Sequence, residues 1–202
     1  MKSFFTIASA LIFFHSYSFV DAESSGSLKP GSLGKTGPSK IFPFKKYEEF
    51  QISDGIAGHS LEKARKVFVE PFNGVDLSEI TQNDLNNLIT MARAATDNEL
   101  HFNEAIKKVG ATKRHPNVPL SAGKTANKIL KLVGSIQVIE IHNKLNLKQG
   151  SPEGKLKELK DKLQKNIKLD HHYAGKKMVS YLSVGQTSGG NTKNDRGGHS
   201  GH

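Results

Sequence analysis

Apolar side chains recur at helical spacing along four stretches of this chain. Within each stretch they return after three or four positions, which is the period of one face of an α-helix. The stretches cover about residues 44–68, 81–110, 121–147 and 152–182. The pattern predicts an all-α fold, a single four-helix antiparallel bundle that occupies residues 44–184.

Local signals set the ends of these helices. The second helix begins after Ser78 or Thr81, because Asp84 stands three residues beyond Thr81 as a variant of the capping box, and it ends at Gly110. In the first stretch, glycines at 55 and 58 predict a kink or a close helix contact near Asp54.

The third stretch is apolar around most of its circumference, which is typical of a central helix. Its β-branched run VGSIQVIEI also permits a strand, but the length of the stretch favours a helix. The segment 111–120 before it contains two prolines, so we expect a surface loop there. After Gln149 and Gly150, Ser151 is expected to cap the fourth helix, with Pro152 at its first position.

Both ends of the chain have too little apolar surface to offset the entropy of ordering. Residues 23–43 are rich in Gly, Ser, Lys and Pro, and residues 185–202 have the same character with two added histidines. We expect a flexible N-terminal arm and a disordered C-terminal tail.

The first 22 residues have the pattern of a secretory signal peptide. Lys2 is followed by an uncharged, mainly apolar stretch from Phe4 to Phe14, and Val20 and Ala22 are small residues suited to a cleavage site. No later stretch is apolar enough to predict a transmembrane segment. The predicted location is extracellular, although the chain contains no cysteine and its core alone has to hold the fold.

The formal net charge is +10, so the chain is expected to be drawn to anionic surfaces. Solvation of the helices by lysine is the alternative reading, since these residues are spread along the chain. With no Trp and four Tyr, a nucleic acid is the least favoured anionic partner. The candidate interaction residues lie in the proline-containing loop and in the tail: Lys113, Arg114, His115, Lys193 and Arg196.

The spacing of the histidines predicts no metal site with a defined geometry. His199 and His202 are weak candidates for copper or zinc, because two imidazoles on a glycine-rich tail give only loose binding. His171 and His142 are interpreted as histidines at the edge of the core; the odds of a site would rise if they faced each other.

No catalytic residue and no cofactor is predicted. The chain has no cysteine nucleophile and no Gly-x-Ser-x-Gly motif. Gly123, Lys124 and Thr125 resemble the end of a phosphate-binding loop, but Val118 stands where the first glycine is required, so this motif is rejected.

Three segments resemble a group of small, secreted, cysteine-free proteins of filamentous fungi. They are YEEFQISDGIAGHSLEKA at 47–64, FNEAIKKVG at 102–110 and AGKTANKILKL at 122–132. The resemblance covers about residues 44–175 and implies a secreted helical protein of the kind counted among candidate effectors, without catalytic residues. The strong basicity and the two tails depart from that pattern.

The leading hypothesis is a secreted, non-enzymatic interaction protein, an effector or virulence-associated factor that acts on a host protein or an anionic surface. One alternative is a carrier that holds an apolar ligand inside the bundle. Another is a membrane-active protein that uses the basic amphipathic helix at 152–182.

Overall fold

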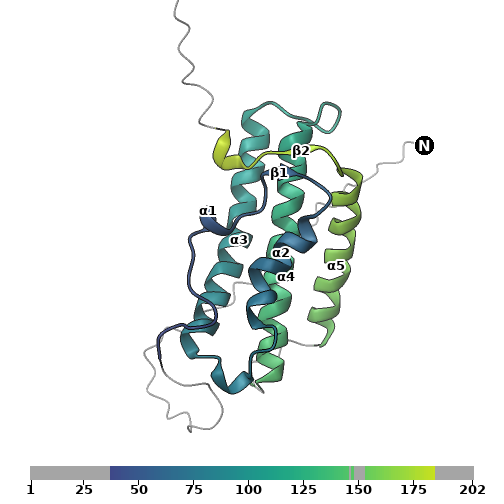
Figure 1. Cartoon of the computed structure of the whole chain (residues 1–202). Coiled ribbons are helices and arrows are strands. Elements are labelled where there is room, and N and C mark those ends of the chain that lie inside the picture. The colour runs from purple at the N-terminus through teal and green to yellow at the C-terminus, as the bar shows by residue number, and fades with distance from the viewer. Residues whose placement is uncertain (1–36, 146, 148–152, 185–202) are drawn as a thin grey trace, which may run out of the picture. The chain divides into compact units, whose positions relative to one another are not determined.

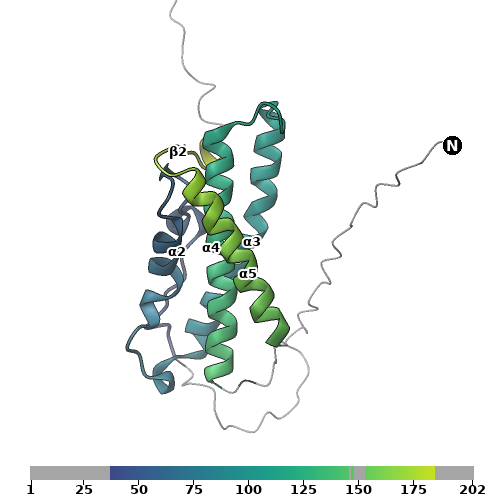
Figure 2. The ribbon, with the colours of Figure 1, turned by 90° about the vertical axis from the view of Figure 1, so that its right-hand side faces the viewer.

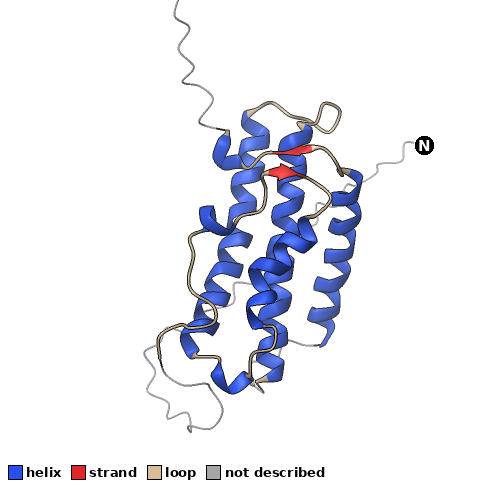
Figure 3. Cartoon of the chain, viewed as in Figure 1, coloured by secondary structure: helices blue, strands red, loops and turns tan. Residues whose placement is uncertain are grey.

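The computed structural model describes residues 37–145, 147 and 153–184. Two short helices, α1 and α2, and a short strand come first, and three longer helices follow (Figures 1 and 3). Three short 3-10 helices, η1 to η3, complete the secondary structure of these residues. The bounds are α1 Tyr47–Phe50, β1 Gly55–Ile56, α2 Ser60–Phe68, η1 Glu70–Phe72, η2 Leu77–Glu79, α3 Gln82–Lys108, α4 Val118–Lys144, α5 Glu153–His172, β2 Lys177–Met178 and η3 Tyr181–Ser183.

Four helices pack together, and α4 is the central one, as its apolar circumference predicts. It contacts α2, α3 and α5, which lie around it (Figures 1 and 2). The fold is not strictly all-α, because β1 and β2 form a two-stranded antiparallel sheet in which Gly55 is opposite Met178. This sheet joins the start of the domain to its end.

The predicted first helix over 44–68 is wrong as a single element. The chain forms α1, then β1, then α2, because Gly55 and Gly58 adopt φ values of +92° and +106°, which disfavour other residues and end a helix. Ile56 lies in β1 and is 51 % exposed.

The boundaries of α3 and α4 follow local capping. Thr81 caps α3 and exchanges hydrogen bonds with Asp84, so the predicted capping box is confirmed. α4 begins at Val118, inside the predicted loop, because Asn117 accepts a hydrogen bond from the Leu120 N–H and Pro119 fits the first turn. The run VGSIQVIEI is helical, and the strand alternative is wrong.

The predicted fourth helix is too long at its C-terminal end. α5 ends at His172, and the chain turns at Gly175 to pair with β1. Met178 is buried, but it enters the core from β2 and not from a helix. Ala174, Met178 and Tyr181 have helical spacing in the sequence, but none of these residues lies in an α-helix.

The ordered domain starts before residue 44. Phe42 is 3 % exposed, and its ring stacks on those of Phe68 and Phe72 at centroid distances of 6.1 and 5.3 Å. Four groups of residues 39–42 donate hydrogen bonds to the Asp84 carboxylate. The predicted flexible arm over 23–43 is thus wrong at its last residues, while residues 23–36 lie outside the described part.

Candidate functional site

Six basic residues lie around the C-terminal end of α3, the loop 109–117 and β2. We call them the basic end, and they are Lys107, Lys108, Lys113, Arg114, His115 and Lys177. All six are exposed, and Figure 1 shows the loop above α3 and α4 with β2 directly below it. The loop closes on itself, since the Thr112 N–H donates to the His115 carbonyl at 3.1 Å, and the basic side chains project from it.

A surface hollow of about 430 Å³ adjoins the basic end. Apolar atoms of Val109, Met178 and Val179 line it, and Lys177 and Asp54 supply charges. Asp54 is already engaged, because it accepts hydrogen bonds from the Ser180 N–H at 2.8 Å and from the Gln51 amide at 2.6 Å. Among the described residues, no carboxylate forms an ion pair with a lysine or arginine of the basic end.

A second basic group lies along α4, where it meets α3. We call Lys124, Lys128 and Lys131 the lysine seam. Glu99 of α3 accepts from Lys131 and lies 3.6 Å from Lys128, and Lys124 hydrogen-bonds the amide oxygen of Asn103. The lysine side chains at 128 and 131 are only 33 % and 21 % exposed.

The charges of the seam perturb one another. Burial, together with repulsion from Lys128, holds the pKa of Lys124 below its usual value. For Glu99, burial acts to raise the pKa, but the hydrogen bond and charge of Lys131 outweigh it and lower the pKa. The three lysines of the seam thus lie around one carboxylate, that of Glu99.

Sequence reasoning missed the lysine seam. Its residues follow the spacing i, i+4, i+7, which places them on one stripe of an otherwise apolar helix. That spacing is the signal that could have revealed it, since a central helix has little reason to carry three aligned lysines.

The buried polar groups hold the fold together. The Tyr47 hydroxyl donates to the Asn127 side-chain oxygen at 2.8 Å, and the Asn127 amide donates to the Ala95 carbonyl at 3.0 Å. Burial raises the pKa of Tyr47 strongly, so its hydroxyl stays protonated. This chain of bonds links α1, α4 and α3, and we assign it a structural role.

The histidines singled out in the sequence do not meet. His142 lies in the last turn of α4 and His171 in the last turn of α5, whereas Lys160 of α5 pairs with Glu140 at 2.9 Å. Position 171 is eleven positions after position 160, which is roughly 16 Å along the helix, so His171 lies far from the end of α4 that carries His142.

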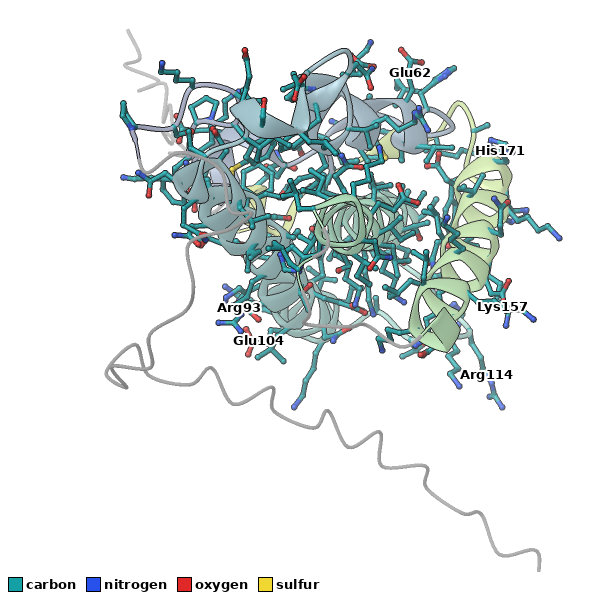
Figure 4. The ribbon with its side chains drawn as sticks, turned by 90° about the horizontal axis from the view of Figure 1, so that it is seen from below. Glu62, Arg93, Glu104, Arg114, Lys157 and His171 are labelled. Carbon is teal, nitrogen blue, oxygen red and sulfur yellow. The ribbon has the colours of Figure 1, made fainter. Side chains whose placement is uncertain are left out.

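The expected place of His171 at the edge of the core is wrong. Its side chain is exposed and points away from the helices (Figure 4), and Asp170 is the buried residue of this turn. The reason is that Asp170 caps α2, accepting from the Ser60 N–H at 3.0 Å and from the Ser60 hydroxyl at 2.7 Å. The burial of His142, by contrast, is partial, and it lowers the pKa of that imidazole.

The rejection of a phosphate-binding loop at Gly123, Lys124 and Thr125 is confirmed, because these residues lie inside α4. Gly123 has a packing role. A Cβ at this position would lie 2.3 Å from the Val179 carbonyl oxygen, so only glycine allows the segment after β2 to cross α4 here.

The remaining predicted site residues, Lys193, Arg196, His199 and His202, lie outside the described residues. Within the described ranges, no group of three or more His, Asp or Glu side chains is placed to hold a metal ion. No helix in that part of the chain is both long and apolar enough to cross a membrane.

Comparisons with known proteins give one match. No curated protein and no solved structure matches the chain. The family model described as Domain of unknown function (DUF8454) matches residues 42–182, a range that begins at the buried Phe42 and ends in η3. Since this match covers more than half of the 202 residues, the chain belongs to the DUF8454 family.

Proposed function

We propose that this protein is a secreted, non-enzymatic interaction protein that binds an anionic partner through its basic end. The partner is an acidic face of a host protein or another anionic surface, in keeping with an effector that a fungus releases toward a host. The observation that carries the proposal is the exposed group of cations around the loop 109–117, which has no ion-pair partner among the described residues. Unneutralised cations attract and orient anionic partners.

The scaffold supports this proposal. We propose that its helices form an antiparallel bundle: along α3 and α4 the pairs Glu99 with Lys131 and Asn103 with Lys124 run in opposite order. A rigid helical body holds a short, closed loop at its end, which is a common way to present binding residues.

The two alternative functions have less support. A carrier needs an enclosed apolar cavity, whereas the two hollows that stand out in the described part, of about 430 and 190 Å³, are open and carry charged residues. A membrane-active helix needs a free apolar face. The apolar face of α5 is used in packing, since Leu159 is buried with Leu132 and Ile136 of α4.

The test compares two variants that each lose two positive charges. Lys113→Gln/Arg114→Gln changes the basic end, and Lys165→Gln/Lys168→Gln changes exposed residues of α5. Binding to poly-glutamate, polygalacturonate and phosphatidylserine vesicles is measured at two salt concentrations. We expect the loop variant to lose affinity for at least one probe while the α5 variant keeps it. Equal losses would mean that net charge alone drives binding and would overturn the proposal.

A further inference from the structure

The lysine seam has the geometry of a linear site. Lys131 lies seven positions after Lys124, so the helix rise separates these two residues by roughly 10 Å. The stripe lies on α4 between the faces that contact α3 and α5, and Figure 4 shows those helices on different sides of α4. The side chains are therefore recessed but not covered.

The residues that the structure describes balance the charge of the seam only in part. Glu99 is the carboxylate that contacts Lys128 and Lys131, and the contact of Lys124 is the neutral amide of Asn103. Three positive charges thus face one negative charge in a half-buried setting, where unpaired charge is more costly than in water. The lowered pKa of Lys124 agrees with this excess of positive charge. A bound anion would offset the excess.

We propose that the lysine seam binds a linear acidic polysaccharide, whose successive carboxylate or sulfate groups pair with Lys124 and Lys128. This inference rests on the proposed function, because it names the class of anionic partner. A polymer chain is narrow enough to reach the recessed ammonium groups of the seam. A flat bilayer would instead contact exposed lysines such as Lys157, which projects outward in Figure 4.

The neighbours of the seam favour a sugar polymer over other polyanions. Asn103 is exposed and Ser121 and Ser135 are half-buried, and these side chains can hydrogen-bond sugar hydroxyl groups. None of the residues of this stripe is aromatic, so it offers no platform for nucleobases. The apolar hollow beside Val109, which could hold an apolar peptide anchor, has no seam residue in its lining.

The seam also continues into the basic end. Lys107 follows Asn103 by one turn of α3, so its side chain lies on the same face of that helix. A polymer that enters along the seam therefore meets the cations of the loop 109–117 next, and the two groups form one track.

The experiment uses three variants of the full chain that each lose two positive charges. They are Lys124→Gln/Lys128→Gln at the seam, Lys113→Gln/Arg114→Gln at the loop and Lys157→Gln/Lys165→Gln on exposed positions of α5. Affinity for polygalacturonate is measured by calorimetry, with poly-uridylate, poly-glutamate and phosphatidylserine vesicles as other probes. Thermal unfolding of each variant confirms that it is folded.

We expect the seam variant to lose about tenfold or more in affinity for polygalacturonate, which corresponds to about 1.4 kcal/mol. The α5 variant should change it by about twofold, as is usual for exposed charges. Equal losses of affinity for polygalacturonate in the seam and α5 variants would show that the inference is wrong. So would a seam variant that loses more affinity for poly-uridylate, poly-glutamate or the vesicles than for polygalacturonate. If only the loop variant loses affinity, the proposed function stands and the seam is not the site.

Discussion

Two buried carboxylates, Asp84 and Asp170, tie distant parts of this chain together. Asp84 accepts from Thr81 at the start of α3 and from three successive backbone N–H groups of residues 40–42. Asp170, at the end of α5, caps α2 across 110 positions of sequence. Each carboxylate thus supplies hydrogen-bond acceptors that the local chain does not supply.

The Asp84→Asn variant should be less stable than the wild type by about 2–4 kcal/mol at pH 7, because an amide cannot accept from all of these donors. Burial acts to raise the pKa of Asp84, but the hydrogen bonds from Thr81, Phe42 and Ser39 outweigh it and hold the pKa far below its usual range. The stabilisation is therefore complete above about pH 4, the unfolded pKa, and is lost as the pH falls toward the folded pKa.

Urea unfolding of both proteins between pH 7 and pH 2 checks this expectation. The gap in unfolding free energy should be constant above about pH 5 and should narrow below about pH 4. Asp161→Asn, at an exposed position of α5, is the matched control and should have little effect. A gap that stays constant to pH 2 would contradict the role given to the Asp84 carboxylate.

The core of α4 gives a second test at the residue scale. Ile136 is 8 % exposed and packs with Leu132 and Leu159, whereas Lys157 is exposed on α5. Ile136→Asp should cost about 3 kcal/mol or more because it buries a carboxylate without a partner, and Lys157→Asp should cost far less. Similar unfolding free energies for the two variants would mean that Ile136 does not lie in the core.

At the scale of elements, close backbone contacts decide where the chain departs from a plain helical bundle. The Val179 N–H donates to the Pro119 carbonyl in the first turn of α4 at 3.1 Å. This contact and the β1–β2 sheet fasten the segment after α5 across the bundle. Gly123 makes the crossing possible, because its missing side chain leaves room for the Val179 carbonyl.

Gly123→Ala should therefore destabilise the protein by about 1–3 kcal/mol, since two backbones would have to separate. The matched control is Gly154→Ala in α5, where an added Cβ meets no atom within 4 Å. That change should stabilise the protein by about 0.5–1 kcal/mol, because alanine is the better helix former. Thermal unfolding measures both, and a shift in the same direction for the two variants would contradict this account of the crossing.

Helical periodicity predicts the elements that are set by local signals. Thr81, Asp84 and Gly110 lie next to the ends of α3, so its limits follow from the sequence. The segments 44–68 and 173–182 carry a similar period, but their structure depends on the β1–β2 pairing, a contact between residues more than a hundred positions apart. Periodicity holds no information about such a pairing, and both segments were predicted wrongly.

The candidate site also has one part that local sequence signals predict and one part that they do not. The prolines at 116 and 119 predict a surface segment, and this places Lys113, Arg114 and His115 in the exposed loop where the structure has them. The lysine seam could not be predicted from local signals alone. Lysines of a helix are normally solvated, and only the packing of α3 and α5 on α4 shows that Lys128 and Lys131 are recessed.

At the scale of the whole molecule, the net charge of +10 says little until its distribution is known. Several lysines of α5 are paired with glutamates, as Lys160 is with Glu140 and Lys162 with Glu158. Other exposed lysines of α5, such as Lys165 and Lys168, have no ion pair among the described residues. The basic end differs from them because it gathers six cations around one loop, and the lysine seam differs because three lysines lie around one carboxylate, that of Glu99.

The most direct test of this account is a footprint of lysine reactivity. Each lysine of the full chain is labelled with acetic anhydride, with and without polygalacturonate, at low and high salt, and the extent of labelling is read by mass spectrometry. We predict that the polymer protects Lys113, Lys124 and Lys128 at low salt and leaves Lys157 and Lys165 reactive. The protection should weaken at high salt. Equal protection of all five lysines at low salt would contradict the central claim that one basic surface binds the anionic partner.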